Sequence, residues 1–276
     1  MKEKSVDAIK TKRWRLTKPL HLHTISEAKE FIDHLGILTV FSDKVLPNLY
    51  DATYSAGKPI AKDGSEGWDW DRIDRAWQFA LMLARDKIVF YGKLIRNKNL
   101  LISMKAFASF YRLWGGKDYL DEYYAGNLSH TAKEMMAVFT KHKILNTKQI
   151  RSYILLRGKE GTKVLHKTLV ELQGKGLLTC VGSIRRRSWD TFLWGILEDW
   201  VPEEIKIEAA SLSKEEAMTN IIKQFVYSVV VTDELTITRF FKWNAEQVSE
   251  RVNYLVSNGS LNVVDFEGNE CLTLEG

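Results

Sequence analysis

The sequence predicts a mainly α-helical fold with small β-hairpins, of the α+β class, built from tandem winged-helix modules. Two observations predict this class. Three short helices followed by a two-stranded hairpin, the winged-helix variant of the helix-turn-helix plan, occur twice in the second half of the chain. Adding 83 to the residue number also aligns five apolar or glycine positions of the two copies: Leu165 with Val248, Leu169 with Val252, Leu172 with Leu255, Gly176 with Gly259, and Leu178 with Leu261. We expect a third, more elaborated copy in the N-terminal part.

The composition is that of an ordinary globular protein without a membrane span. The 276 residues are 45% hydrophobic and 27% charged, and apolar runs such as residues 225–231 are too short to cross a bilayer. The charged N-terminus lacks the apolar stretch of a secretory signal, so we expect a cytoplasmic protein. Cys180 and Cys271 fall in predicted strands without metal-ligand spacing to the six histidines, so we expect no disulfide, metal or cofactor. The sequence also lacks phosphate-loop, GxSxG, HExxH and CxxC motifs.

The first domain is expected over residues 1–126. Its first 20 residues hold seven bases and two acids, and we interpret them as a basic arm or an irregular edge. A helix then begins at Thr24, which forms a capping box with Glu27, and it ends at Gly36. The next residues, LGILTVFSD at 35–43, have the apolar character of a buried strand.

A loop, a helix and a hairpin complete this domain. Residues 57–70 combine glycines, a proline and two tryptophans, which predicts a loop. The following helix opens on Asp69, Asp71 and Asp74. Three such carboxylates either bind a metal or complement the positive end of the helix dipole, and the dipole is the simpler explanation. Residues 87–103 predict two strands around an RNKN turn, a hairpin of the kind that serves as a wing.

The middle domain, expected over residues 127–202, carries most of the positive charge. Residues 141–187 hold 12 lysines or arginines against two acids. The first helix is expected to have a capping box formed by Thr131 and Glu134. The predicted helices cover 129–143, 147–155 and 162–176, and the predicted strands cover 177–182 and 191–197.

The last helix and the wing of this domain are the candidate DNA-binding surface. In helix-turn-helix modules that helix enters the major groove while basic side chains contact phosphates. With the leucines facing inward, Lys163, His166 and Lys167 face outward, and Thr168 is a further outward candidate. The wing tip adds side chains suited to phosphate or minor-groove contact, namely Arg185, Arg186, Arg187 and Trp189. We therefore predict contact with double-stranded DNA. The alternative is a solvated turn, with lysines that only solubilise the helices.

The last domain, expected over residues 203–276, has the opposite charge. Residues 198–276 carry 15 acids and six bases, and the predicted wing includes Asp265, Glu267 and Glu270. This wing would repel phosphate, so we expect a structural role or a protein partner at this acidic domain. The predicted helices cover 213–227, 236–243 and 244–259, and a hairpin covers 260–274.

Two stretches make the chain resemble a known family. The segment HLGILTVFSDKVLPNLYDA at 34–52 and the ending LVSNGSLNVVDFEG at 255–268 are similar to the AlkZ/YcaQ-type winged-helix DNA glycosylases of bacteria. The resemblance is diffuse and covers most of the chain. It implies tandem winged helices that cradle duplex DNA, damaged DNA included, and excision of alkylated bases or unhooking of interstrand crosslinks. It also implies a further small β domain after the last wing, which we do not expect in this chain.

The family's chemistry implies a Gln-apolar-Gln or Gln-apolar-Asp motif shortly after a Leu-Gly that ends a helix. The polar side chains of that motif hold the attacking water. Leu35-Gly36 is present here, but the motif positions fall on Thr39, Val40 and Phe41. Thr39 can hydrogen-bond a water, whereas Phe41 cannot. Losing a water-positioning carboxylate or amide lowers the rate on the order of 10²-fold or more.

Asp43 is the nearest carboxylate after these positions, and it shares the face of Phe41 if the strand continues. Thr39 and Asp43 are therefore the candidate catalytic residues. We expect a DNA-binding protein related to alkylation- and crosslink-repair glycosylases that lacks their base-excision mechanism. The residues leave open whether it is an enzyme, and they favour that it is not.

Two alternatives stay open. One is an active DNA glycosylase, a hydrolase of N-glycosyl bonds, which uses a displaced carboxylate on damaged bases. A polar pocket around Thr39 and Asp43 would favour it. The other is a winged-helix regulator or a scaffold for protein interaction, which an exposed apolar patch on the last domain would favour.

Overall fold

The same sheet topology occurs three times along the chain. The structure, a computed structural model, describes residues 2–56, 69–185 and 190–275. Within these residues the strands form three antiparallel sheets of three strands each, in the orders β1-β3-β2, β4-β6-β5 and β7-β9-β8. In each sheet the strand between the first two helices pairs with the second strand of the hairpin, as in a winged helix. The α+β class and the tandem winged helices are therefore confirmed.

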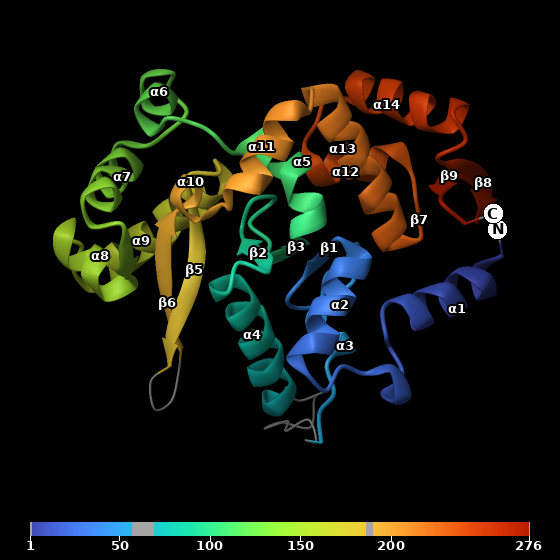
Figure 1. Cartoon of the computed structure of the whole chain (residues 1–276), viewed down its shortest axis with the longest axis horizontal. Helices are drawn as coiled ribbons and strands as arrows, with labels where there is room; N and C mark the ends of the chain where they lie inside the picture. The colour runs from blue at the N-terminus through green and yellow to red at the C-terminus, as the bar shows by residue number, and fades with distance from the viewer. Residues whose placement is uncertain (1, 57–68, 186–189, 276) are drawn as a thin grey trace.

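The first module, in the centre of Figure 1, is a complete winged helix, as expected for a third copy. Thr24 and Glu27 form the predicted capping box, and Gly36 ends the helix at φ +74°. Asp69 caps the third helix by accepting a hydrogen bond from the N–H of Arg72, in line with the dipole interpretation. The elements are α2 (Ile25–Leu35), β1 (Ile37–Thr39), α3 (Leu49–Ala52), α4 (Trp70–Arg85), β2 (Val89–Gly92) and β3 (Leu100–Ser103).

The second module carries the long wing that runs beside α4 in Figure 1. The predicted capping box of Thr131 and Glu134 is wrong, because Thr131 already lies inside the helix and Ser129 accepts the hydrogen bond of the Ala132 N–H instead. Thr168 is buried and donates to the carbonyl of Val164, so it does not face outward. The elements are α7 (His130–His142), β4 (Ile144–Asn146), α8 (Thr147–Tyr153), α9 (Gly158–Gly174), β5 (Leu178–Arg185) and β6 (Asp190–Ile196).

The third module repeats the second at the predicted offset of 83 residues. All eight apolar residues of the alignment are buried. Gly176 and Gly259 follow α9 and α14 with φ of +71° and +72°, a backbone conformation that favours glycine. The elements are α12 (Lys214–Val229), β7 (Val231–Thr232), α13 (Glu234–Phe241), α14 (Ala245–Ser257), β8 (Asn262–Phe266) and β9 (Asn269–Thr273).

The N-terminal residues, for which we expected a basic arm or an irregular edge, form a regular helix, α1 (Glu3–Arg13), so the expectation of an irregular edge is wrong. Val6 is its one buried residue, so the helix lacks the apolar periodicity that would reveal it in the sequence. Its end docks on the third module, because the Arg13 guanidinium donates to the carbonyl of Tyr227 at 2.8 Å and pairs with Glu275 at 2.5 Å. Both chain ends therefore lie close together (Figure 1).

The hydrophobic core crosses from module to module. One cluster joins the first module to the second, and the other joins the first to the third. The boundaries expected at residues 126 and 202 therefore stay predictions. The remaining helices lie outside the three modules: η1 (Lys18–Leu20) precedes the first, α5 (Met104–Trp114) and α6 (Tyr119–Tyr124) connect the first to the second, and α10 (Leu197–Trp200) and α11 (Glu203–Ser211) connect the second to the third.

The end of α2 is completed by the third module. Leu35 is the last residue of α2, and its carbonyl accepts hydrogen bonds from Gln224 Nε2 at 2.7 Å and from the Ser228 hydroxyl. A Cβ added to Gly36 would lie 2.3 Å from Gln224 Cδ. Glycine is therefore favoured here by its positive φ and by the close approach of the Gln224 side chain from α12.

Candidate nucleic-acid interface

The candidate catalytic residues begin where strand β1 ends. The chain leaves the sheet after Thr39, so the strand does not continue to Asp43, and Asp43 and Phe41 do not share a strand face. Thr39 is 4% exposed, and its hydroxyl donates to the carbonyl of Phe41 at 2.7 Å. This bond turns the backbone away from the strand direction and uses the only proton of the hydroxyl.

Phe41 packs in an aromatic cluster between the first two modules. Its ring lies 5.0 Å from that of Trp77 in an edge-to-face arrangement and 6.2 Å from that of Tyr50. Trp77 of α4 also contacts Phe192 of β6, with the ring centroids 5.5 Å apart. The position at which the resemblance implies a polar residue is therefore occupied by a half-buried aromatic ring, which packs on the Trp77 side chain that in turn contacts the second module.

Asp43 is fully engaged in a structural turn. One carboxylate oxygen accepts the N–H groups of Val45 and Leu46 at 2.9 and 3.1 Å, and the other forms an ion pair with Lys98. Only 6% of its side chain is exposed. Asp43 thus fastens the segment after β1 to the hairpin of the first module, and its oxygens are directed at these partners instead of at an open pocket.

The outward face of α9 matches the prediction. Lys163, His166 and Lys167 are exposed, although Lys163 also pairs with the exposed Glu160 at 2.7 Å. Such a solvent-exposed pair contributes little to stability and leaves the ammonium available to another anion. Further exposed bases of this module are Lys148, Arg157 and Lys159.

The wing is described only up to its tip. Arg185 is the last residue of β5, and its backbone pairs with Asp190. Arg186, Arg187 and Trp189 lie outside the described residues. At Gly182, where the backbone φ is +141°, an added Cβ would lie 3.3 Å from the Arg85 side chain. Strand β5 of the wing therefore packs against α4 of the first module at Gly182.

Sequence reasoning missed a group of cations at the meeting point of the three modules. Lys93 and Arg96 come from the β2–β3 hairpin, and Lys242 follows α13. They line a pocket with a volume of about 510 Å³. No sequence signal could bring these residues together, because 146 residues separate Arg96 from Lys242 and no motif contains both.

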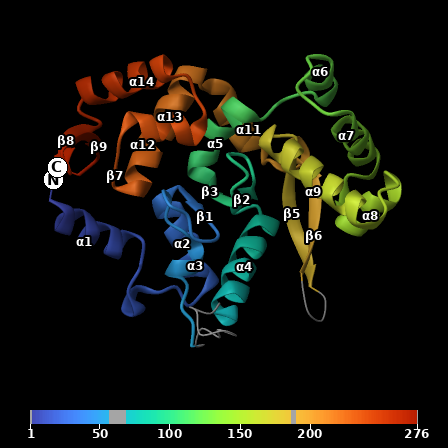
Figure 2. The same cartoon turned by 180° about the vertical axis from the view of Figure 1, so that it is seen from behind.

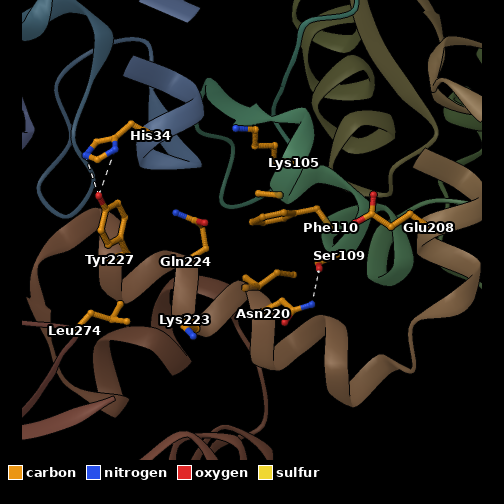
Figure 3. A pocket seen from close by; sticks show the side chains of 12 residues that line it. His34, Lys105, Ser109, Phe110, Glu208, Asn220, Lys223, Gln224, Tyr227 and Leu274 are labelled. Carbon is orange, nitrogen blue, oxygen red and sulfur yellow. Dashed lines mark hydrogen bonds between the residues drawn. The ribbon is translucent and has the colours of Figure 1, made fainter. Parts of the chain in front are cut away.

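A second pocket lies between α2, α5 and α12 (Figure 3). His34 Nε2 and the Tyr227 hydroxyl are 2.8 Å apart at one end, and Asn220 donates to Ser109 at 3.3 Å. Burial, then Arg13 and Arg15, lower the pKa of His34. Figure 3 shows the amino groups of Lys105 and Lys223 pointing in different directions, and Glu208 also lines the pocket. Its charges do not converge on one point.

The wing of the third module is acidic. Asp265, Glu267 and Glu270 of its wing are exposed. Exposed apolar side chains also occur in this module, each on a different element, namely Leu235 of α13, Tyr254 of α14 and Val263 of β8. Among the described residues, no helix combines the length and apolar character needed to cross a bilayer.

Comparison with known proteins identifies a family and a similar solved structure. The profile of a family described as AlkZ related matches residues 22–242. Among solved structures, the chain is similar to the DNA glycosylase AlkZ of Streptomyces sahachiroi, with a TM-score of 0.56 and 13% identity over 99% of this chain and 70% of that one. At this identity the likeness concerns the fold. No curated protein sequence matches.

Proposed function

Because the chain belongs to the AlkZ-related family, we propose that it binds double-stranded DNA without excising bases by the water-positioning mechanism that the resemblance implies. The observation that carries this proposal is the packing of Phe41 between Trp77 and Tyr50, together with the engagement of Asp43. The relation to DNA glycosylases would then lie in the scaffold, and the chemistry would have been lost from it.

Base excision by water needs a polar side chain that faces the sugar and can hold the nucleophile. Thr39 uses its proton on the Phe41 carbonyl, and Asp43 accepts two backbone N–H groups and pairs with Lys98. Freeing Asp43 would leave these backbone donors and Lys98 without their partner, at a cost of several kcal/mol. The rate that such a site could reach falls by about 10²-fold or more relative to one with a preorganised group.

Binding to DNA is supported by the exposed basic face of α9. Lys163, His166 and Lys167 lie on the third helix of a winged helix, the element that enters the major groove in this class of module. In the sequence, an arginine run begins at Arg185, the last described residue of strand β5. Lysine and arginine contacts to phosphates release counterions, so the affinity should fall steeply as salt rises.

The first test measures base release and binding on the same duplex. With protein in excess over DNA that carries methylated purines, we expect no release above the uncatalysed rate, together with affinity that falls between low and moderate salt. Release that disappears in Asp43→Asn would establish an active glycosylase with a displaced carboxylate. A flat salt dependence, or affinity unchanged by alanine at Arg185–Arg187, would overturn DNA binding and favour a regulator or scaffold that acts through the acidic third module.

A further inference from the structure

The pocket at the meeting point of the three modules is assembled from the hairpin of the first, the end of α9 in the second and the end of α13 in the third. In Figure 2 the end of α9 lies beside the β2–β3 hairpin. The wall residues come from all three modules and from α5. Lys93 and Arg96 belong to the hairpin of the first module, and Trp114 ends α5. Val170 and Gly174 belong to α9, and Lys242 follows α13.

The walls of this pocket are held in place by direct contacts. The Lys93 N–H donates to Gln173 Oε1 at 3.0 Å, and the Thr179 hydroxyl donates to the Tyr91 carbonyl at 3.0 Å. Gly176 lies so close to the backbone of Trp114 that an added Cβ would be 2.2 Å from the Trp114 carbonyl oxygen. The pocket is therefore preformed, and a ligand would not have to order it.

The charge of the pocket is not compensated by the protein. Among the described residues, no acidic residue lines it, and none of Lys93, Arg96 and Lys242 lies in an ion pair with a carboxylate. Burial lowers the pKa of Lys93, and no carboxylate opposes that shift. The ends of α9 and α13 supply only the partial negative charge of helix C-termini. Three cations in one pocket thus lack an anion.

Arg96 occupies a turn position that disfavours arginine. Arg96 and Asn97 have φ of +52° and +58°, and the Lys98 N–H closes the turn by donating to the Ile95 carbonyl at 3.0 Å. Two successive positive φ values are the mark of a type I′ turn, in which glycine and asparagine are preferred. An arginine here adds strain that its contacts within the protein do not offset, because no partner of its guanidinium is found among the described residues.

The pocket also continues the basic face of α9. Lys163, Lys167, Val170 and Gly174 follow one another at spacings of four, three and four, so they form one stripe along the helix. The first two carry the exposed charges, and the last two line the pocket. Over 11 residues the stripe runs about 16 Å along the helix axis.

We propose that this junction pocket binds a phosphate group, and that this phosphate belongs to the backbone of the DNA bound along α9. The inference rests on the proposed function, because α9 sets the line on which the phosphate lies. Arg96 supplies a planar donor pair, Lys93 and Lys242 supply point charges, and Trp114 offers an apolar wall for the adjoining sugar. The pocket of Figure 3 does not fit this chemistry, since Glu208 lines it and its two ammonium groups diverge.

The test compares a pocket variant, Lys93→Gln with Arg96→Gln and Lys242→Gln, with a control that loses the same charge, Lys105→Gln with Lys214→Gln and Lys223→Gln. Each chain is titrated with one duplex over a salt series, and its melting temperature is measured. Each lost phosphate contact should lower the salt slope by about one. The three cations share one phosphate, so the pocket variant should lose about one unit of slope, and the control should keep the slope of the unchanged protein.

The outcomes separate the two proposals. A folded pocket variant with an unaltered slope overturns this inference and leaves DNA binding by α9 standing. If the unchanged protein shows no salt-sensitive duplex binding, the proposed function fails, and inorganic phosphate is then tested by its effect on the melting temperature. A rise that the pocket variant lacks and the control retains means that the pocket takes a free phosphate. No rise overturns the inference in both forms.

Discussion

The second and third modules share one architecture and carry opposite charges on it. The alignment at 83 residues matches buried positions in α9 and α14, and it also pairs the exposed Lys163 with Glu246 and the exposed Lys167 with Glu250. The buried residues of the two helices are apolar at equivalent positions, whereas the exposed residues at equivalent positions carry charges of opposite sign. The comparison teaches that packing fixes this fold, while its exposed faces are free to take on different partners.

The largest expected effect tests the shared packing. Leu172→Ala and Leu255→Ala each remove a buried side chain at equivalent positions, and each should lower the free energy of unfolding by about 2–5 kcal/mol. Urea unfolding followed by circular dichroism measures both. A loss confined to one of the two variants would break the equivalence of the modules.

A pair of glycines should separate the modules by their surroundings. Gly176 and Gly259 have the same φ, so alanine adds about 1 kcal/mol of strain at either. At Gly176 the new Cβ also meets the Trp114 carbonyl oxygen at 2.2 Å, while at Gly259 it meets nothing within 4 Å. Gly176→Ala should therefore cost about 2 kcal/mol or more, and Gly259→Ala about 1. Equal losses in thermal unfolding would contradict the close packing at the junction.

The charge comparison can be reversed. Lys163→Glu with Lys167→Glu gives α9 the charges of α14, and we expect duplex affinity at moderate salt to fall by about 10–100-fold, about 1.4–2.7 kcal/mol. The matched control is Glu246→Lys with Glu250→Lys, which should leave the affinity within a few-fold. Fluorescence anisotropy with one labelled duplex reads both. A larger effect from the α14 pair would assign binding to the third module.

The smallest effect concerns the two thiols. Burial raises the pKa of Cys180 to about 12, and burial also raises the pKa of Cys271, with Asp233 next in effect. Thiolates are the reactive form, so alkylation at neutral pH should be slow and should speed up as pH rises. Cys271 should react first, because Cys180 is fully buried and needs the second module to open. Mass spectrometry of timed samples gives both rates, and faster labelling of Cys180 would indicate a loose second module.

The sequence reveals the parts of the fold that depend on local patterns. The capping box of α2, the two later hairpins and the repeat at 83 residues follow from spacing that helices and strands impose. Helix α1 could not be predicted from the sequence, because its single buried residue gives no apolar periodicity. The sequence also suggested Thr131 as the N-cap of α7, a position that Ser129 occupies. The basic face of α9 could be predicted because its residues share one helix.

The pocket at the junction could not be predicted in this way. Lys93, Arg96 and Lys242 meet only through tertiary packing, and each of them looks like an ordinary surface cation in the sequence. Asp43 shows the same limit from the other side. Because Asp43 lies two residues after Phe41, the sequence suggested that it replaces the missing polar residue of the family motif. Its partners, including Lys98 from 55 residues away, give it a structural role instead.

The hydrogen bonds that Gln224 and Ser228 give to the Leu35 carbonyl make the modules unequal in how far they can be exchanged. Repeats of this kind invite deletion, grafting and reordering, but α2 has no complete C-terminal end unless α12 is present. A chain cut after residue 202 would therefore lose more than an acidic appendage, because it would leave the helix in front of β1 unfinished. The modules share one architecture, yet they are not interchangeable, because the third module caps the C-terminal end of α2 in the first.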